Sequence, residues 1–132
     1  MIRTRSQSDP ATVQAFAVDL ARLCGEDKCT DVLLLDVRGI SQICDYLIIA
    51  SGTSDRQMRA VAQHLEDLGK ARESAPFQSN RDEATTWVIV DFVEIVVHLF
   101  EPNQRDYYDL EGLWSDGKRI DWKRAASASS KS

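Results

Sequence analysis

This 132-residue chain has few residues that can cross-link a fold or interrupt helices and strands. It contains three cysteines, three prolines and six glycines. Cys24, Cys29 and Cys44 are odd in number and match no zinc-ligand spacing. We therefore expect buried free thiols in a reducing compartment, and neither a metal nor another cofactor. Long apolar runs are missing too, because stretches such as 32–35 and 47–50 are far shorter than a membrane span.

The net charge of −5 is spread unevenly along the chain. Residues 9–114 hold 19 acidic and 9 basic side chains, whereas residues 115–132 hold five basic and two acidic ones. An acidic body lacks the clustered Lys and Arg that neutralise phosphates, which disfavours nucleic-acid binding by the folded part and favours basic protein partners. The N-terminus has no apolar secretory stretch, so we expect a soluble, cytoplasmic protein without membrane contact.

Three helices are predicted from capping residues and apolar spacing. Asp9-Pro10 starts a helix that should run to about Cys24, where Gly25 would stop it. Ser54 and Gln57 form a capping box that starts a second helix, which Gly69 would end. A third helix should begin at Pro102 and place Tyr107, Leu110 and Trp114 along one face.

Apolar runs over 32–37 and 45–50 predict two buried strands that pair as an antiparallel hairpin, and a short edge strand is expected near 74–78. With a second hairpin over 87–100, the order becomes αββαββα. We predict one α/β (α+β) domain over 9–115, with a mixed β-sheet covered by helices on one side. Residues 1–8 are predicted to be a flexible tail, and residues 116–132 a disordered one.

The stretch 87–100 is the most informative part of the chain, because two strand-like segments flank a short interruption. If Phe92-Val93 is a two-residue turn, Trp87 lies opposite His98 and Asp91 lies opposite Glu94. One face of the hairpin is then purely aliphatic. The other face carries a mixed set: Trp87, Ile89, Asp91, Glu94, Val96 and His98.

This mixed face allows two interpretations. Like charges opposite each other on a sheet are destabilising, so Asp91 and Glu94 would be compensated by a cationic partner. The face would then be a docking surface with an aromatic anchor, Trp87, for a protein rich in Lys and Arg. The alternative is a half-buried sheet face whose acids lie at the solvent-exposed turn end.

An enzymatic function is the alternative from another class. The turn over 51–54 joins a strand to a helix and could hold a phosphate on free helix amides, as in nucleotidyltransferases. Asp45, Asp91 and Glu94 would then bind Mg²⁺, but the chain has no Asp-x-Asp pair after this turn and no lysine within it. His98 could act as a base oriented by Asp91, yet no Ser or Cys nucleophile with a supporting motif accompanies it. We predict no catalytic residue.

Arg105 lies in the first turn of the last predicted helix, where a cation opposes the helix dipole. It could form a surface pair with Asp109 four residues on, near Glu101. Alternatively it could reach across and hold a carboxylate of the sheet.

Three stretches of the chain resemble the Iojap/ribosomal silencing factor family. They are 45–57, which reads Asp-Tyr-Leu-Ile-Ile-Ala-Ser-Gly-Thr-Ser-Asp-Arg-Gln, then 87–91 with 96–100, and then 105–114, which reads Arg-Asp-Tyr-Tyr-Asp-Leu-Glu-Gly-Leu-Trp. Together with Asp36-Val37-Arg38 they stand in the family's order and spacing, and the likeness covers roughly residues 10–115.

The resemblance implies a nucleotidyltransferase-like αββαββα domain that is not an enzyme. It implies binding to the large ribosomal subunit through a basic protein, the L-series protein fourteen, so that small-subunit joining is blocked and translation is repressed. It also implies a docking surface around Trp87, and a homodimer. On this reading the expected partner-binding residues are Trp87, Ile89, Asp91, Glu94, Val96, His98, Arg105 and Tyr108.

The second hairpin departs from the family pattern at its turn. Val93 and Glu94 stand where the family usually has Gly and Asp, and Ser79-Asn80-Arg81 replaces a Glu-Gly before the Trp motif. Because Val disfavours the positive φ of a tight hairpin turn, a longer turn or another turn type is an alternative to the two-residue turn.

Overall fold

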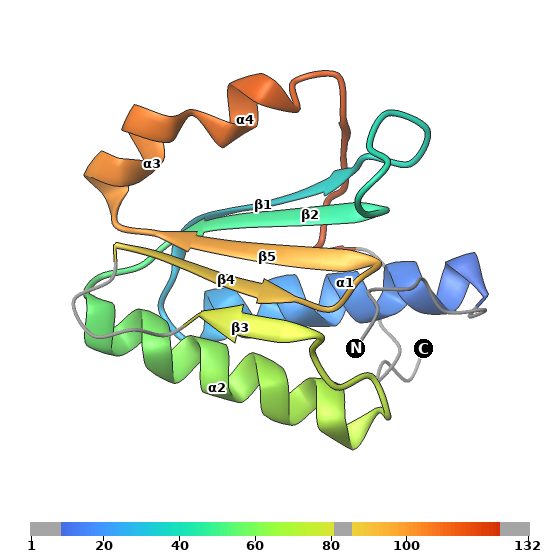
Figure 1. The fold of residues 1–132 in the computed structure, drawn as a ribbon, viewed down its shortest axis with the longest axis horizontal. Helices are drawn as coiled ribbons and strands as arrows, with labels where there is room; N and C mark the ends of the chain where they lie inside the picture. The colour runs from blue at the N-terminus through green and yellow to red at the C-terminus, as the bar shows by residue number, and fades with distance from the viewer. Residues whose placement is uncertain (1–8, 81–85, 125–132) are drawn as a thin grey trace.

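In the computed structural model, which describes residues 9–80 and 86–124, six strands form one sheet in the order β3-β4-β5-β2-β1-β6 (Figure 1). β2 and β5 run parallel, and the other neighbouring pairs are antiparallel, which confirms a mixed α/β domain. The elements in chain order are α1 (Pro10–Glu26), β1 (Thr30–Asp36), β2 (Tyr46–Ser51), α2 (Asp55–Ala71), β3 (Gln78–Asn80), β4 (Trp87–Asp91), β5 (Ile95–Phe100), α3 (Pro102–Tyr108), α4 (Leu110–Leu113) and β6 (Lys118–Arg119).

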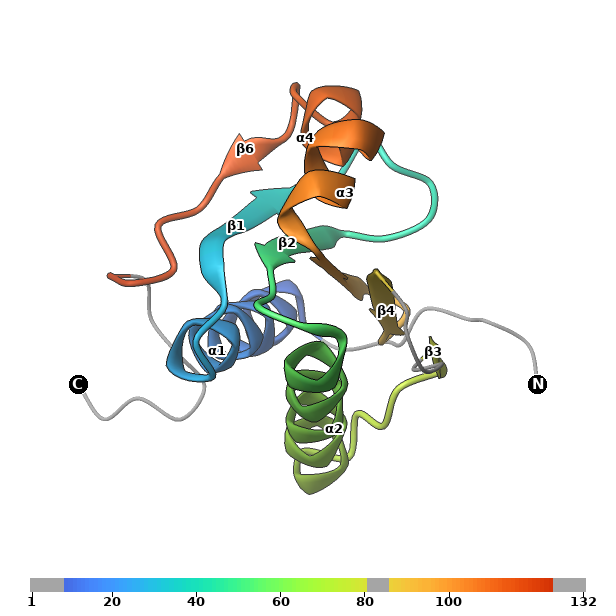
Figure 2. The ribbon, with the colours of Figure 1, turned by 90° about the vertical axis from the view of Figure 1, so that its left-hand side faces the viewer.

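Helices lie on both faces of the sheet, which corrects the expectation of one covered side (Figures 1 and 2). The long helices α1 and α2 cover one face, and the short α3 and α4 lie over the other. No helix in the described ranges has both the length and the apolarity needed to cross a membrane. The predicted aliphatic face of the second hairpin packs in the same core cluster as residues of α1 and α2, through Val88, Val90, Ile95, Val97 and Leu99.

Two glycines do not end the helices as the sequence suggested. α1 continues past Gly25 to Glu26, and α2 continues past Gly69 to Ala71. A Cβ at Gly25 would lie 3.1 Å from the indole of Trp122, and one at Gly69 would lie 2.6 Å from the ring of Phe92. Both glycines therefore serve close packing against another segment rather than termination.

The turn of the second hairpin is not Phe92-Val93, because the Phe92 amide donates to the carbonyl of Ile95 at 2.8 Å, so the predicted register is wrong. Trp87 pairs with Phe100 and Asp91 pairs with Val96, a displacement of two residues. Because side chains alternate with a period of two, a displacement of two residues leaves each side chain on its predicted face. Glu94 is the exception, since it lies in the turn.

The turn itself is built around Val93, whose φ is +76°. The amide of Glu94 donates to the carbonyl of Phe92 at 3.0 Å, which makes a γ-turn centred on Val93. The amide of Val93 donates to Oδ1 of Asp91 at 2.7 Å. These two bonds hold a β-branched residue in a conformation that strongly favours glycine.

The chain after β5 also differs from expectation. The last helix breaks at Asp109, which has a φ of +46° and separates α3 from α4. Within the stretch 116–132, predicted to be disordered, residues 118–119 form β6 beside β1, and the indole N–H of Trp122 donates to the carbonyl of Val32 at 2.9 Å. The predicted tail over 1–8 and the remainder, 125–132, lie outside the described residues.

We predict that Val93→Gly stabilises the protein by about 1 kcal/mol, because a β-branched residue at positive φ is strained and glycine is not. Urea unfolding of the variant, followed by circular dichroism, checks this. Val93→Asn should gain part of the same amount, since Asn tolerates the left-handed region. A Val93→Gly protein less stable than the parent would contradict a positive φ at this turn.

Candidate functional site: an aromatic surface on the second sheet face

The mixed face predicted from the sequence lies on the side of the sheet that α3 and α4 occupy. Trp87 and Ile89 of β4 are half-buried and pack at the margin of a second apolar cluster, which includes Val96 and Phe100 of β5. Because α3 and α4 are short, they leave the β4–β5 part of this face without a long helix over it (Figure 1). These strand residues are therefore brought together as predicted.

An aromatic cluster, formed by Trp87, His98, Phe100, Tyr107 and Tyr108, gives this face its character. The Trp87 ring lies 4.8 Å from the Phe100 ring and 4.6 Å from the Tyr108 ring, measured between centroids. Its indole N–H donates to Nδ1 of His98 at 3.0 Å. Rings in such contact bury area while the indole keeps a hydrogen-bond partner, and the cluster remains partly exposed.

His98 is held neutral by this arrangement. Burial lowers the pKa of its imidazole to about 4, although the nearby Asp91 carboxylate acts in the opposite direction. The indole N–H can only donate, so Nδ1 must accept and the proton of the neutral ring lies on Nε2. A proton on Nδ1 would break the bond to Trp87. The cluster is therefore uncharged at neutral pH.

Tyr107 and Tyr108 extend the cluster outward from α3. Tyr108 is 49% exposed and Tyr107 is 77% exposed, although their rings contact each other at 5.1 Å between centroids. Tyr108 was among the residues predicted from the sequence, and Tyr107 was not. Adjacent aromatics on a short helix cannot both face the core, which is the pattern that identifies one of them as a surface residue.

Asp91 and Glu94 were predicted to lie opposite each other, and this prediction is wrong because Asp91 pairs with Val96. Asp91 is only 7% exposed, and its carboxylate accepts the Val93 amide, so it stabilises the turn. Glu94 lies within the turn and is half-buried, and its carbonyl accepts the amides of Asp45 and Tyr46. The acidic end of the hairpin therefore abuts the start of β2.

Arg105 holds α3 onto the sheet. It is 8% exposed, and its guanidinium donates to Glu111 at 2.6 Å, to the carbonyl of Asp31 at 2.8 Å and to the hydroxyl of Ser51 at 2.9 Å. Neither of its two predicted partnerships, a surface pair with Asp109 or a sheet carboxylate, is the arrangement observed. Arg105 instead ties the last helices to the ends of β1 and β2.

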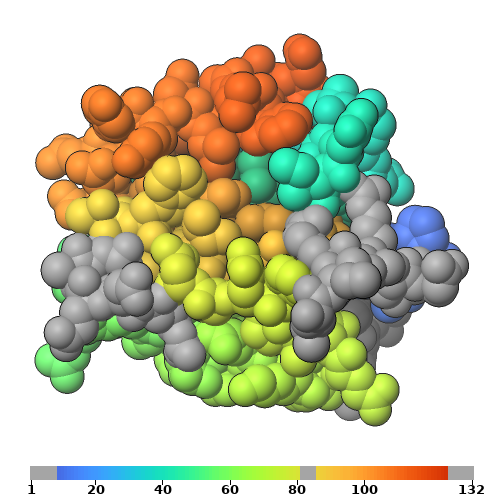
Figure 3. Space-filling model, in the orientation of Figure 1, coloured from blue at the N-terminus to red at the C-terminus, as the bar shows by residue number. Residues whose placement is uncertain are grey.

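A hollow on the same face is framed by β4, by α3 and α4, and by the loop between β1 and β2, with atoms of β5 and β2 at its floor (Figure 3). The frame carries the exposed large apolar side chains of the described residues, which sequence reasoning missed except for Tyr108: Ile40, Ile43, Tyr107, Tyr108 and Leu113. Exposed large apolar side chains that gather on one face are typical of interaction sites. We call this region, together with the aromatic cluster, the docking face.

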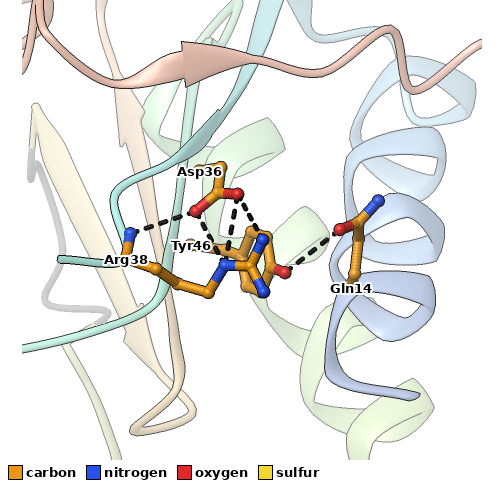
Figure 4. A network of polar contacts seen from close by, with 4 residues as sticks. All are labelled: Gln14, Asp36, Arg38 and Tyr46. Carbon is orange, nitrogen blue, oxygen red and sulfur yellow. Dashed lines mark hydrogen bonds and ion pairs between the residues drawn. The ribbon is translucent and has the colours of Figure 1, made fainter. Parts of the chain in front are cut away.

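The loop beside the hollow is anchored at its base by a polar network (Figure 4). The Arg38 guanidinium donates to the Asp36 carboxylate at 2.7 Å, and this bond lowers the pKa of Asp36. The same guanidinium lies over the Tyr46 ring, whose hydroxyl donates to Oε1 of Gln14 at 3.1 Å. The loop that carries Ile40 and Ile43 therefore starts and ends on fixed residues.

Among the described residues, those named for the enzymatic alternative do not form a metal-binding group. In the described part of the chain, no three His, Cys, Asp or Glu side chains converge to hold a metal ion. This part includes Asp45, Asp91 and Glu94, the ligands that the enzymatic alternative would need. The turn at 51–54 is a helix cap, as the sequence predicted: Ser54 Oγ accepts the Gln57 amide at 3.0 Å, and Gln57 Oε1 accepts the Thr53 amide at 3.1 Å.

Comparison with known proteins shows the family. The model of the family described as "Ribosomal silencing factor during starvation" matches residues 10–132, so the chain belongs to this family. It is 36% identical over 101 residues to the ribosomal silencing factor RsfS of Bacillus subtilis, with 76% of this chain and 86% of that one covered.

Two further relatives agree in sequence and in fold. The chloroplastic protein Iojap of Zea mays is 31% identical over 118 residues, which cover 89% of this chain and 51% of that protein. A crystal structure of a Chromobacterium violaceum protein superposes with a TM-score of 0.71 at 28% identity, with 92% of this chain and 98% of that chain covered. The resemblance drawn from the motifs is confirmed.

We predict that folding stability falls as pH drops from about 6.5 to about 4, because the unfolded chain binds a proton at His98 that the folded chain excludes. Because the pKa of His98 is lower in the folded chain, this contribution to stability is complete at a pH above the pKa of the unfolded chain. It disappears at a pH below the pKa of the folded chain. The contribution is on the order of 3 kcal/mol. Unfolding at pH 7 and pH 4 measures it, with His98→Gln as the variant that should lose this part of the difference. An NMR titration in which His98 protonates near 6.5 would contradict the account.

Proposed function

We propose that this protein represses translation by binding the large ribosomal subunit and sterically blocking the joining of the small subunit, without catalysing a reaction. Family membership supports the ribosomal role, because the relatives are named ribosomal silencing factors. The observation that carries the proposal is the docking face, where aromatic and aliphatic side chains remain exposed around a hollow. We expect it to act in the cytoplasm.

The partner proposed for this face is a basic protein of the large subunit, the L-series protein fourteen. Trp87, Tyr108 and Ile89 supply apolar anchors of the kind that dominate interface energies. Glu94 lies in the turn that the buried Asp91 holds in place, and the body of the protein is acidic, which complements Lys and Arg on the partner. His98 and Val96 complete the surface, and Arg105 contributes from inside by fixing α3.

Occlusion requires no chemistry from the protein. A domain bound where the small subunit must approach excludes it by volume alone. The neutral Trp87–His98 pair suits this task, because an uncharged aromatic surface loses little hydration when a partner covers it. Because a homodimer is also expected, light scattering should accompany every binding measurement.

We predict that Trp87→Ala weakens binding to purified large subunits by about 2–4 kcal/mol, as for a central aromatic anchor. Co-sedimentation on sucrose gradients measures the loss, and light scattering of mixed subunits should show that joining is restored. Trp122→Ala is the matched control, since Trp122 is also half-buried with a bonded indole N–H but lies beside β1 and α1. Equal binding by both variants, with folding intact, contradicts the proposed face.

We predict that Glu94→Lys slows association and reduces its dependence on salt, because a rim charge steers a partner of opposite sign. Stopped-flow or biosensor kinetics at several ionic strengths measure both quantities. Glu26→Lys makes the same charge change at an exposed residue at the end of α1, away from the docking face. If the two substitutions alter the association rate alike, net charge rather than this site guides the encounter.

A further inference from the structure

Two of the three buried cysteines lie against each other where α1 ends. The amide of Cys29 donates to the carbonyl of Cys24 at 3.0 Å, and the amide of Lys28 donates to the carbonyl of Gly25 at 3.2 Å. With Lys28 at a φ of +76°, these bonds form a Schellman motif. A contact between the side chains at these two positions frequently accompanies the motif, and both cysteines belong to the same core cluster. The helix end therefore brings the two thiols together.

The two sulfurs are chemically different. The side-chain interaction between the two thiols lowers the pKa of Cys29 and raises the pKa of Cys24. Nε2 of Gln57 also donates toward the Cys29 sulfur, at 3.7 Å, and to the carbonyl of Asp27 at 2.8 Å. Donors on a sulfur favour its thiolate, so Cys29 is the nucleophile of the pair and Cys24 the proton donor.

Cys29 also has a route to solvent. It lines an open cavity of about 1040 Å³ between the end of α1, β1 and the segment around Trp122, whereas Cys24 is fully buried. Cys44 belongs to the other apolar cluster, on the opposite face of the sheet. A small reactant that enters the cavity therefore meets Cys29 first.

We propose that Cys24 and Cys29 form a redox-active dithiol that hydroperoxides convert to a disulfide. The Cys29 thiolate attacks the peroxide, so that a sulfur–oxygen bond forms, the O–O bond breaks and an alcohol, or water from hydrogen peroxide, leaves. The Cys24 thiol then displaces water from the Cys29 sulfenic acid. In total two thiols lose two electrons and two protons, and the hydroperoxide is reduced to an alcohol and water.

The second step requires that the two cysteines lie close together. The Cys24–Cys29 backbone bond keeps the residues close, and disulfides require Cα atoms within about 7 Å. The proposal is independent of ribosome binding, because the pair lies beside α1, whereas the docking face lies on the opposite face of the sheet. Its failure would leave the proposed function untouched.

Peptide mapping after oxidation tests the proposal. The reduced full-length protein is exposed to tert-butyl hydroperoxide, quenched with acid and N-ethylmaleimide, and digested with trypsin. Cleavage after Arg22, Lys28 and Arg38 separates the two cysteines into peptides 23–28 and 29–38. We expect these peptides to appear joined by a disulfide and to separate on reduction. We expect them to form at least about tenfold faster than Cys44 is oxidised.

Single variants assign the roles. Cys24→Ser should leave a Cys29 sulfenic acid that dimedone traps, Cys29→Ser should leave no trapped product at Cys24, and Cys44→Ser should form the disulfide at the parental rate. Trapping at Cys24, disulfides that include Cys44 at a comparable rate, or complete alkylation of Cys24 and Cys29 after peroxide treatment would each overturn the proposal. Far-UV circular dichroism confirms that the variants compared are folded.

Discussion

The structure depends on how one sheet is covered on its two faces. Strand side chains alternate, so half of them point away from α1 and α2 toward the second face of the sheet. Whether those side chains are buried depends on what covers that face. Within residues 9–80 and 86–124, two helices of 17 residues cover the first face, but only α3 and α4, of 7 and 4 residues, lie over the second. The uncovered remainder, over β4 and β5, is the docking face.

Arg105 and the Trp87–His98 pair decide how that uncovered area behaves. Arg105 bonds to Asp31 and Ser51 and so holds α3 on the sheet. In this position Tyr108 of α3 packs against the Trp87 ring. His98 remains neutral because a proton on Nδ1 would break the bond to the indole and would also be poorly solvated. The result is an apolar surface held in one shape before any partner arrives, which lowers the entropic cost of binding.

Much of the fold could be predicted from local patterns. The order of elements, the capping box at Ser54 and the two faces of the second hairpin follow from periods of 3.6 and 2. The hairpin register could not be obtained in this way, because the turn at Val93 adopts a positive φ that its residue type disfavours. Gly25 and Gly69 misled for a related reason, since their purpose is contact with distant residues, Trp122 and Phe92.

The site was predicted less completely than the fold. Trp87, Ile89, Val96 and His98 share a face by alternation, but the inward role of Arg105 depends on Asp31 and Ser51, which are remote in sequence. The exposure of Ile40, Ile43 and Leu113 depends on where the β1–β2 loop and α4 come to lie. The proximity of Cys24 and Cys29 depends on the left-handed conformation of Lys28. Lysine has no preference for that conformation, so it could not be predicted from the residue type.

Hydroxyl-radical footprinting of the protein, free and bound to purified large ribosomal subunits, tests the central claim most directly. The account predicts that Trp87, Tyr107 and Tyr108 become protected on binding while Trp122 keeps its reactivity. Protection of Trp122 and the outer side of α1, with Trp87 and Tyr108 as reactive as in the free protein, would contradict it.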